Sequence, residues 1–458
     1  MTIKEAKNIY CLGIGGIGVS GLARLLFAMG KNVSGSDLKE SEITRDLVKL
    51  GIKISFGSNI VEGSPDLVIY TPAVPAEELD KINIAKLSQG QALGRLMEDK
   101  YGIGVTGTNG KSTTSAILGK ILENAGLDPT VLIGSLLSPK NESDKFKANA
   151  RMGLGRFFVA ESDEYARKML ENKPKMIVLT NVAEDHLDYY KDLSDIKRAF
   201  SEYIKSLPSD GILIYNADDH NAVDVGKHAT CHKFTFGIRH YADLQALNLG
   251  VRGQGAGGSQ TFDLHLNDEK IGTFQLQVPG LFNVSNALGA ILAGLKLSVE
   301  PASIAQTLEN YAGIWRRFEI VGRLDGKVVI SDYAHHPAGV TATIEAAKQF
   351  YPDKKILVVF QPHHRNRTKS LFGEFIESLL IADEVILPEI FDVAGREHGE
   401  QISSNDLARE LVLRNVKATF AQNLDEAETL IRDKIKDFDA VLMMGAGDID
   451  LLARKLVE

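Results

Sequence analysis

The chain has 458 residues, of which 44% are hydrophobic and 24% are charged, and its formal net charge is -8. This composition excludes a disordered or fibrous protein, and the length allows about three domains of ordinary size. The negative charge argues against nucleic acid as a partner, and two cysteines, Cys11 and Cys231, cannot build a disulfide framework.

The amino-terminal residues lack the basic segment, long apolar stretch and small-residue cleavage site of a secretory signal. No later run reaches the ~18 apolar residues that a membrane span requires. We therefore expect a cytoplasmic protein that binds neither membrane nor nucleic acid, as a monomer or homodimer.

Residues 8–97 alternate short apolar strands with helical stretches, which is typical of a parallel sheet. The expected strands are 9–12, 33–35 and 67–70, and the expected helix is 19–29, with Gly30 as its left-handed cap. We predict a Rossmann-like domain at residues 1–98.

A glycine-rich sequence, GIGGIG at residues 13–18, joins the first strand to the first helix. Such glycines permit a tight turn and close backbone approach, and the helix offers unpaired amides to a diphosphate. The pattern alone fits NAD, FAD or a UDP-sugar equally well, or a turn needed only for packing. The candidate binding residues are Gly15, Gly16, Ile17, Gly18, Asp37 and Thr71.

A second α/β unit is predicted at residues 99–315, with strands at 103–106, 157–160, 176–180 and 212–215 and a helix at 111–124. The glycine-rich stretch 250–259 is expected to form a mobile hairpin loop between two strands.

The sequence GTNGKST at residues 107–113 resembles a phosphate-binding loop between a strand and a helix. It departs from the strict GxxxxGK[ST] spacing because Val105 occupies the first glycine position. Backbone amides would surround phosphates, the lysine would meet the β- and γ-oxygens, and a hydroxyl would reach magnesium. The candidate residues are Gly107, Thr108, Asn109, Gly110, Lys111, Ser112 and Thr113.

Two polar segments follow the next predicted strands, ESDE at 161–164 and NVAEDHLD at 181–188. Carboxylates beside a phosphate loop can hold a hard cation, and a neutral imidazole can bind a metal ion or orient a phosphate. Glu164 and His186 are the candidates, although exposed polar turns would show the same pattern.

A third unit, Rossmann-like and expected at residues 316–458, contains strands at 328–330, 356–360, 385–387 and 440–443 and helices at 340–349 and 406–414. Each strand ends in a polar cluster, at 332–337, 361–368, 392–398 and 445–448. Ligands of open α/β sheets bind beyond the carboxyl ends of the strands, so we expect these clusters to converge.

Two phosphate-binding loops in one chain favour ATP together with a nucleotide-linked substrate. An NAD-dependent oxidoreductase would leave the loop at 107–113 unexplained, and a nucleotide-sensing module would leave the metal-type residues unexplained.

Over essentially its full length the chain resembles the Mur ligase family. The matching segments are GIGGIGVSGLA at 13–23, GTNGKSTT at 107–114, AESDE at 160–164, NVAEDHLD at 181–188, GLFNVSNAL at 280–288, RRFE at 316–319, DYAHHP at 332–337, FQPHHRNRT at 360–368 and GAGDI at 445–449.

The resemblance implies an ADP-forming, ATP- and magnesium-dependent joining of L-alanine to UDP-N-acetylmuramate through an acyl phosphate. This is a step of peptidoglycan precursor synthesis and so bears on cell shape and division. A recycling ligase that joins a ready-made tripeptide to the same sugar is the alternative within the family.

The resemblance also implies roles for single residues, including Ser112, Glu164 and His186 as the metal ligands. By the same resemblance, Asn283 and Asn286 lie near adenine, and Arg317 and Asp332 reach the nucleotide. It places His335, His363 and Arg367 near the groups that are joined, with His335 or His363 as the general base.

The chain departs from the family pattern at three places. Phe282 stands where histidine is usual, His364 replaces the first arginine of the 360–368 segment, and the loop 391–397 matches only approximately.

Overall fold

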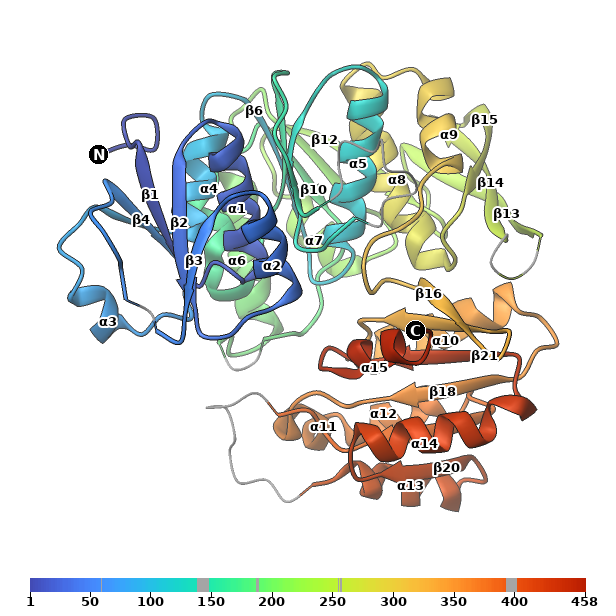
Figure 1. Ribbon diagram of the computed structural model, residues 1–458. Helices are drawn as coiled ribbons and strands as arrows, with labels where there is room; N and C mark the ends of the chain where they lie inside the picture. Colours follow the sequence, from blue (N-terminus) through green and yellow to red (C-terminus); the bar gives the residue numbers. More distant parts are fainter. Residues whose placement is uncertain (59, 138–147, 187–188, 254, 256–257, 393–401) are drawn as a thin grey trace. The chain divides into compact units, whose positions relative to one another are not determined.

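The computed structural model describes residues 1–58, 60–137, 148–186, 189–253, 255, 258–392 and 402–458. The chain forms two compact units (Figure 1). The first unit consists of Met1–Asn248, Phe262–Phe274 and Val284–Ala312, and the second of Leu249–Thr261, Gln275–Asn283 and Gly313–Glu458. Among the described residues, no helix has the length and apolar character needed to cross a membrane.

The amino-terminal sheet has the strand order β3-β2-β1-β4-β5, and its neighbouring strands are parallel. The chain leaves β1 on one side toward β2 and later returns on the other side as β4, so the topological switch point lies between β1 and β4. Its elements are β1 Asn8–Leu12, α1 Ile17–Ala28, β2 Asn32–Asp37, α2 Glu42–Lys49, β3 Lys53–Phe56, β4 Leu67–Tyr70, α3 Ala76–Asp80, β5 Lys86–Ser88 and α4 Gln89–Met97.

Both faces of this sheet are covered, which is why its strands are apolar runs rather than alternating patterns. Ile9 and Cys11 of β1 lie in the core that contains α1 and α4, whereas Tyr10 and Leu12 lie in a smaller core on the other face. Gly30 has φ +78°, which confirms the predicted left-handed cap.

The central sheet has the order β15-β14-β13-β12-β11-β10-β6-β9-β7-β8, with β6 paired in parallel to both β10 and β9. Its strands are β6 Tyr101–Thr106, β7 Thr130–Leu132, β8 Ala150–Arg151, β9 Phe157–Glu161, β10 Met176–Leu179, β11 Ile212–Asn216, β12 His232–Gly237, β13 Leu244–Arg252, β14 Ser259–Leu266 and β15 Glu269–Leu276. Its helical elements are α5 Lys111–Asn124, η1 Tyr165–Glu171, α6 Leu193–Lys205, α7 His220–Gly226, α8 Leu281–Lys296 and α9 Pro301–Glu309.

The predicted glycine-rich loop does join two strands, β13 and β14, although β13 continues to Arg252. Residues 254 and 256–257, on which the prediction of a mobile loop falls, lie outside the described residues.

The carboxyl-terminal sheet has the order β16-β17-β21-β18-β19-β20, with only β16 antiparallel to its neighbour among the described pairs. Its elements are β16 Glu319–Leu324, β17 Lys327–Asp332, α10 Pro337–Phe350, β18 Ile356–Phe360, α11 Arg365–Ser370, α12 Phe372–Leu379, β19 Glu384–Pro388, α13 Ser404–Leu413, β20 Lys417–Ala421, α14 Leu424–Lys434, η3 Ile435–Asp437, β21 Ala440–Met444 and α15 Ile449–Lys455.

Alternate residues of this sheet face two different cores, as expected for strands buried on both sides. Val358 and Leu442 belong to the core under α10 and α12, whereas Val359 and Met443 belong to the core under α14 and α15. The predicted α/β fold class, with Rossmann-like sheets at both ends of the chain, is confirmed.

Candidate active site

The phosphate loop, residues 107–113, leaves the end of β6 in the middle of the central sheet and enters α5 at Lys111. Gly107 has φ +134° and Gly110 has φ +85°. A Cβ on Gly107 would lie 2.1 Å from Thr180 Oγ1, and one on Gly110 would lie 2.1 Å from Asn286 Oδ1. Both positions therefore require glycine, for backbone conformation and for space.

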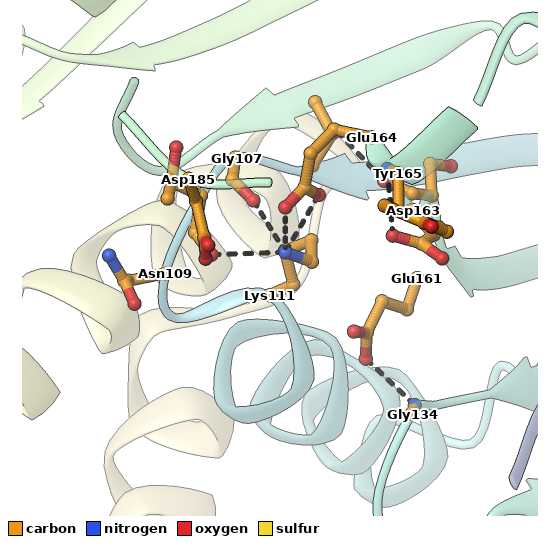
Figure 2. Close-up of polar contacts among 12 residues, drawn as sticks. Gly107, Asn109, Lys111, Gly134, Glu161, Asp163, Glu164, Tyr165 and Asp185 are labelled. Carbon is orange, nitrogen blue, oxygen red and sulfur yellow. Dashed lines mark hydrogen bonds and ion pairs between the residues drawn. The ribbon is translucent and has the colours of Figure 1, made fainter. Parts of the chain in front are cut away.

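Lys111 points back over the loop that precedes it (Figure 2). Its Nζ donates to the carbonyl oxygens of Gly107 at 2.7 Å and Thr108 at 3.1 Å. It also forms an ion pair with Glu164, at 2.8 Å to Oε2, although the two side chains are only 13% and 3% exposed. The ammonium group is thus held at the mouth of the loop by groups from two elements.

Opposing effects act on the pKa of Lys111. Burial lowers it, but the negative charges of Glu164, Glu161 and Asp163 outweigh burial and raise the pKa above its ordinary value. The side chain therefore stays a cation at neutral pH, as a phosphate-binding role requires.

The acidic segment after β9 supplies these charges. Glu161 accepts a hydrogen bond from the Gly134 amide at 2.7 Å and one from the Ser112 hydroxyl, and burial raises its pKa. Asp163 pairs with Lys168 at 2.8 Å, and burial, which would raise its pKa, is outweighed by Lys168 and Lys111, so its pKa is lowered.

His186 lies beside the same pair, in a left-handed conformation with φ +54°. Its Nε2 is 3.6 Å from Glu164 Oε1 and 3.9 Å from Asp185 Oδ2, and its ring is 4.9 Å from that of Tyr165. Burial lowers the pKa of His186, but Glu164 and Asp185 outweigh it, and the net pKa is raised. Residues 187–188 of the predicted segment lie outside the described residues.

Within the described part of the chain, no three His, Cys, Asp or Glu side chains form a ready-made metal cluster. The structure does gather oxygen donors around Lys111, namely the Ser112 hydroxyl and the carboxylates of Glu161 and Glu164. Oxygen ligands are those that Mg²⁺ prefers, so Ser112, Glu161 and Glu164 fit that ion, whereas His186, beside Glu164, would add a less typical nitrogen ligand.

The glycine loop after β1 is held by the acidic residue that the sequence associated with it. Asp37 accepts the Gly15 amide through Oδ2 and the Leu38 amide through Oδ1, both at 2.8 Å. A Cβ on Gly13 would lie 2.4 Å from the methyl group of Thr71, at the end of β4. Asp37 and Thr71 thus lie against the loop at the switch point. A ribose contact by Asp37 stays a prediction.

Three of the four predicted polar clusters, at the ends of β17, β18 and β21, lie together in the second unit, as predicted; of the fourth, 392–398, only residue 392 lies within the described residues. Gln361 donates to Asp448 at 2.8 Å, and the Arg316 guanidinium donates to the carbonyl oxygens of Gly445 and Gly447. Asp332 is 4% exposed and accepts the amides of Phe318 and Ala334, both at 2.7 Å. Burial raises its pKa in spite of these bonds and the nearby positive charge of Arg317.

His335 and His363 lie in the same cluster, with ring centroids 6.1 Å apart. His335 Nδ1 is 2.9 Å from the Tyr333 carbonyl oxygen, which can only accept. Nδ1 therefore carries the proton, and Nε2 of the neutral ring keeps the lone pair that a general base needs. His363 stacks on Phe391 with centroids 5.6 Å apart.

Burial, together with the charges of His364, His335, Arg367 and Arg316, lowers the pKa of His363 to about 3. A general base works best with a pKa near the working pH. Of the two histidines that the sequence offered as bases, His335 is therefore the better supported.

The same shift predicts how stability depends on pH. The folded pKa of His363 lies below the unfolded value of about 6.5, so the unfolded chain binds the proton more readily. Stability should fall as the pH drops from about 6.5 toward 3. Between pH 7 and pH 5, wild type should lose about 2 kcal/mol more unfolding free energy than His363→Asn. Urea titrations at several pH values measure this, with a substitution at the exposed His232 as control. If the unfolding free energies of wild type and His363→Asn changed equally with pH, this prediction would be wrong.

Two arginines of the 360–368 segment have different surroundings. Arg365 pairs with Asp392 at 2.7 Å and Glu389 at 3.6 Å and donates to the Ile402 carbonyl. Arg367 lies close enough to His363 to lower its pKa. Of the predicted loop 391–397, residues 393–397 lie outside the described residues.

Asn283 and Asn286 both lie in the first turns of α8, 2% and 8% exposed. Asn286 is next to Gly110 of the phosphate loop, and its carbonyl oxygen accepts from Thr114. The Asn283 side chain donates to the carbonyl oxygen of Pro279, and both of these residues belong to the second unit. Phe282, in place of the usual histidine, packs against the carboxyl-terminal core.

Three family models together match most of the chain. They are the Mur ligase family catalytic domain at residues 8–101, the Mur ligase middle domain at 105–294 and the Mur ligase glutamate ligase domain at 316–447. A UDP-N-acetylmuramate–L-alanine ligase from Alkaliphilus metalliredigens is 37% identical over 462 residues, covering 99% of this chain and 97% of the relative. The chain belongs to the Mur ligase family.

Other relatives, by sequence and by structure, are ligases of the same family. A UDP-N-acetylmuramate–L-alanine ligase from Clostridium tetani is 39% identical, covering 98% of this chain and 97% of its own. The crystal structure of the UDP-N-acetylmuramate-alanine ligase from Thermotoga maritima is 29% identical with a TM-score of 0.81, covering 98% of both chains. The crystal structure of a murein peptide ligase from Psychrobacter arcticus is 26% identical with a TM-score of 0.70, covering 98% of this chain and 97% of that protein.

Four polar residues of this Mur ligase lie in segments that the sequence singled out, but the sequence predicted no individual role for them, and the structure places them in or beside the clusters. They are Glu161, Asn181, Arg316 and Gln361. Apart from Arg316, which precedes β16, each stands at or just after the carboxyl end of a predicted strand, and that position was the signal available.

Proposed function

We propose that this Mur ligase joins L-alanine to UDP-N-acetylmuramate with cleavage of ATP to ADP and phosphate, a step of peptidoglycan precursor synthesis in the cytoplasm. The observation that carries the proposal is Lys111, held as a buried cation at the mouth of the phosphate loop by Glu164. The full-length identity of 37–39% to ligases of that name supports the choice of substrates.

We assign UDP-N-acetylmuramate to the glycine loop of residues 1–98, ATP to residues 99–315 and the amino acid to residues 316–458. Binding of ATP would draw Lys111 from Glu164 toward the β- and γ-phosphates, because these groups together carry more negative charge than one carboxylate. Ser112, Glu164 and His186 would hold Mg²⁺, which neutralises charge on the phosphates when bound. In this assignment Asp332 and Arg317 serve the nucleotide, and the protein acts as a monomer or homodimer.

Physical chemistry dictates the order of events. A carboxylate is a poor electrophile, so transfer of the γ-phosphoryl group to it gives an acyl phosphate that an amine can attack with loss of phosphate. Lys111 stabilises charge on the transferring group. His335 Nε2 takes the proton from the incoming ammonium, and Arg367 holds the amino acid's carboxylate through a two-pronged hydrogen bond.

The acyl phosphate can be trapped. With ATP, magnesium and UDP-N-acetylmuramate but no amino acid, hydroxylamine should yield a hydroxamate and ADP in equal amounts, because hydroxylamine replaces the amine. Mass spectrometry detects the product. An adenylated sugar with release of pyrophosphate would contradict the mechanism.

The acceptor is tested by ADP release with alanine, glycine, serine and the tripeptide in turn. We expect alanine to give the highest kcat/KM. Use of the tripeptide with rejection of free alanine would replace the proposal with a recycling ligase.

A further inference from the structure

The loop that binds phosphates is clamped by the segment that follows the neighbouring strand β10. The Asn181 side chain makes two bonds to the backbone of one loop residue, Asn109. Its Oδ1 accepts the Asn109 amide at 2.9 Å, and its Nδ2 donates to the Asn109 carbonyl at 2.8 Å. The Thr180 hydroxyl donates to the same carbonyl at 2.6 Å. A single primary amide thus fixes both polar groups of one backbone residue.

The backbone of the same segment completes the clamp. The Thr108 amide donates to the Asn181 carbonyl at 3.0 Å, and the Thr108 hydroxyl accepts the Ala183 amide at 2.9 Å. A Cβ on Gly107 would lie 2.8 Å from the Asn181 carbonyl oxygen and 3.0 Å from its nitrogen. The loop and the segment are therefore in direct backbone contact, which only a glycine at position 107 permits.

These bonds decide which amides of the loop can meet a phosphate. The amides of Thr108 and Asn109 are already used by Asn181. Those of Lys111, Ser112 and Thr113 lie in the first turn of α5, where a helix leaves its amides without helical partners. The bonds to Asn181 thus hold the backbone of residues 108 and 109 in place, and they leave the amides of residues 111–113 to bind phosphate.

We propose that Asn181 is a positioning residue that holds the phosphate loop in its nucleotide-binding conformation. The proposal rests on the proposed function, since it concerns the same ATP site. Asn181 acts through Asn109 and touches no reacting atom. Its loss should weaken nucleotide binding, because the loop must then be ordered at the expense of binding free energy.

The test is the affinity for Mg-ATP, measured by calorimetry in the absence of any amino acid. In Asn181→Ala two hydrogen bonds are lost, and we expect Kd and KM for ATP to rise about ten-fold. The KM values for alanine and UDP-N-acetylmuramate should stay unchanged. Asn181→Asp, which has the same shape, keeps the acceptor for the Asn109 amide but sets a carboxylate against its carbonyl. It should bind ATP at least as weakly as Asn181→Ala.

Asn124→Ala is the matched control. Asn124 donates one side-chain hydrogen bond to Thr307 at 3.1 Å, at the far end of α5 and about 20 Å along the helix from Lys111. It should lower thermal stability without changing the affinity for ATP. UDP-N-acetylmuramate binding shows that each variant is folded.

The failures of the two proposals are distinguishable. Wild-type affinity for ATP in Asn181→Ala, or in Asn181→Asp, would overturn the role of Asn181 while leaving the ligase intact. Wild-type protein that binds ATP but makes no hydroxamate and ligates no amino acid would overturn the proposed reaction, and the ATP affinities would still decide the role of Asn181.

Discussion

Replacing Lys111 with alanine should reduce the rate of ligation by at least about 10²–10³-fold, because the variant loses a fixed cation aimed at the phosphoryl group. It should still bind UDP-N-acetylmuramate, since the glycine loop after β1 is built by Asp37 and Thr71 and contains no part of the phosphate loop. Calorimetry with UDP-N-acetylmuramate and an ADP-release assay measure the two effects.

Lys111→Ala should also destabilise the fold. Glu164 is 3% exposed, and removing Lys111 leaves this buried carboxylate with only the His186 ring, 3.6 Å away, as a positive partner in the part of the chain that the structure describes; breaking a buried ion pair typically costs up to ~3–5 kcal/mol. The double variant Lys111→Met with Glu164→Gln places no charge at either position. Compared with Lys111→Ala, it should recover most of the lost stability and none of the activity. This pair of variants separates the chemical role of Lys111 from its structural one.

Lys168→Ala is the matched control for Lys111→Ala. Lys168 pairs with Asp163 in the same acidic segment, and its ammonium group is bound there rather than to the loop carbonyls. Its ion pair is partly exposed and should be worth less than ~1 kcal/mol. Comparable losses of sugar affinity and of activity in Lys111→Ala would show that the two nucleotide sites are not separate. That outcome would refute the assignment of one substrate to each loop.

Arg367→Ala should raise the KM for alanine by roughly 30-fold or more and leave the KM for ATP nearly unchanged, since truncating one partner of a buried charge pair costs ~2–5 kcal/mol. Steady-state kinetics with each substrate varied in turn measure the effect. Arg367→Lys should recover only part of it, because lysine cannot form the two parallel bonds of a guanidinium.

Arg365 is the control for Arg367, and only the structure shows how the surroundings of the two arginines differ. Its guanidinium is already bound to Asp392, Glu389 and the Ile402 carbonyl, so it has a structural role. Arg365→Ala should cause a small loss of thermal stability and little change in the KM for alanine. Loss of alanine use in Arg365→Ala, with normal use in Arg367→Ala, would show that the change at His364 has shifted the register of the segment.

The sequence determined the long buried elements, because an apolar run in a parallel sheet and a helix that starts at a glycine turn are local features. The strand Ile356–Phe360 and the helix Lys111–Asn124 agree with the prediction residue by residue. Short or half-exposed strands such as β3 and β20 were missed, since their alternation is weak and their pairing is decided by distant residues. The phosphate loop was predicted because its lysine and hydroxyls have little use in packing.

Only the tertiary structure decided which polar residues act on one another. Glu164 stands 53 positions from Lys111, and Asn181 stands 72 positions from Asn109. Neither spacing carries a local signal, because both contacts arise from the order β10-β6-β9, which sets the ends of these strands side by side. The same holds for the surroundings that separate Arg365 from Arg367 and that lower the pKa of His363. Residue types and their places in the motifs are written in the sequence, whereas partners, burial and charge state depend on which strands the fold makes neighbours.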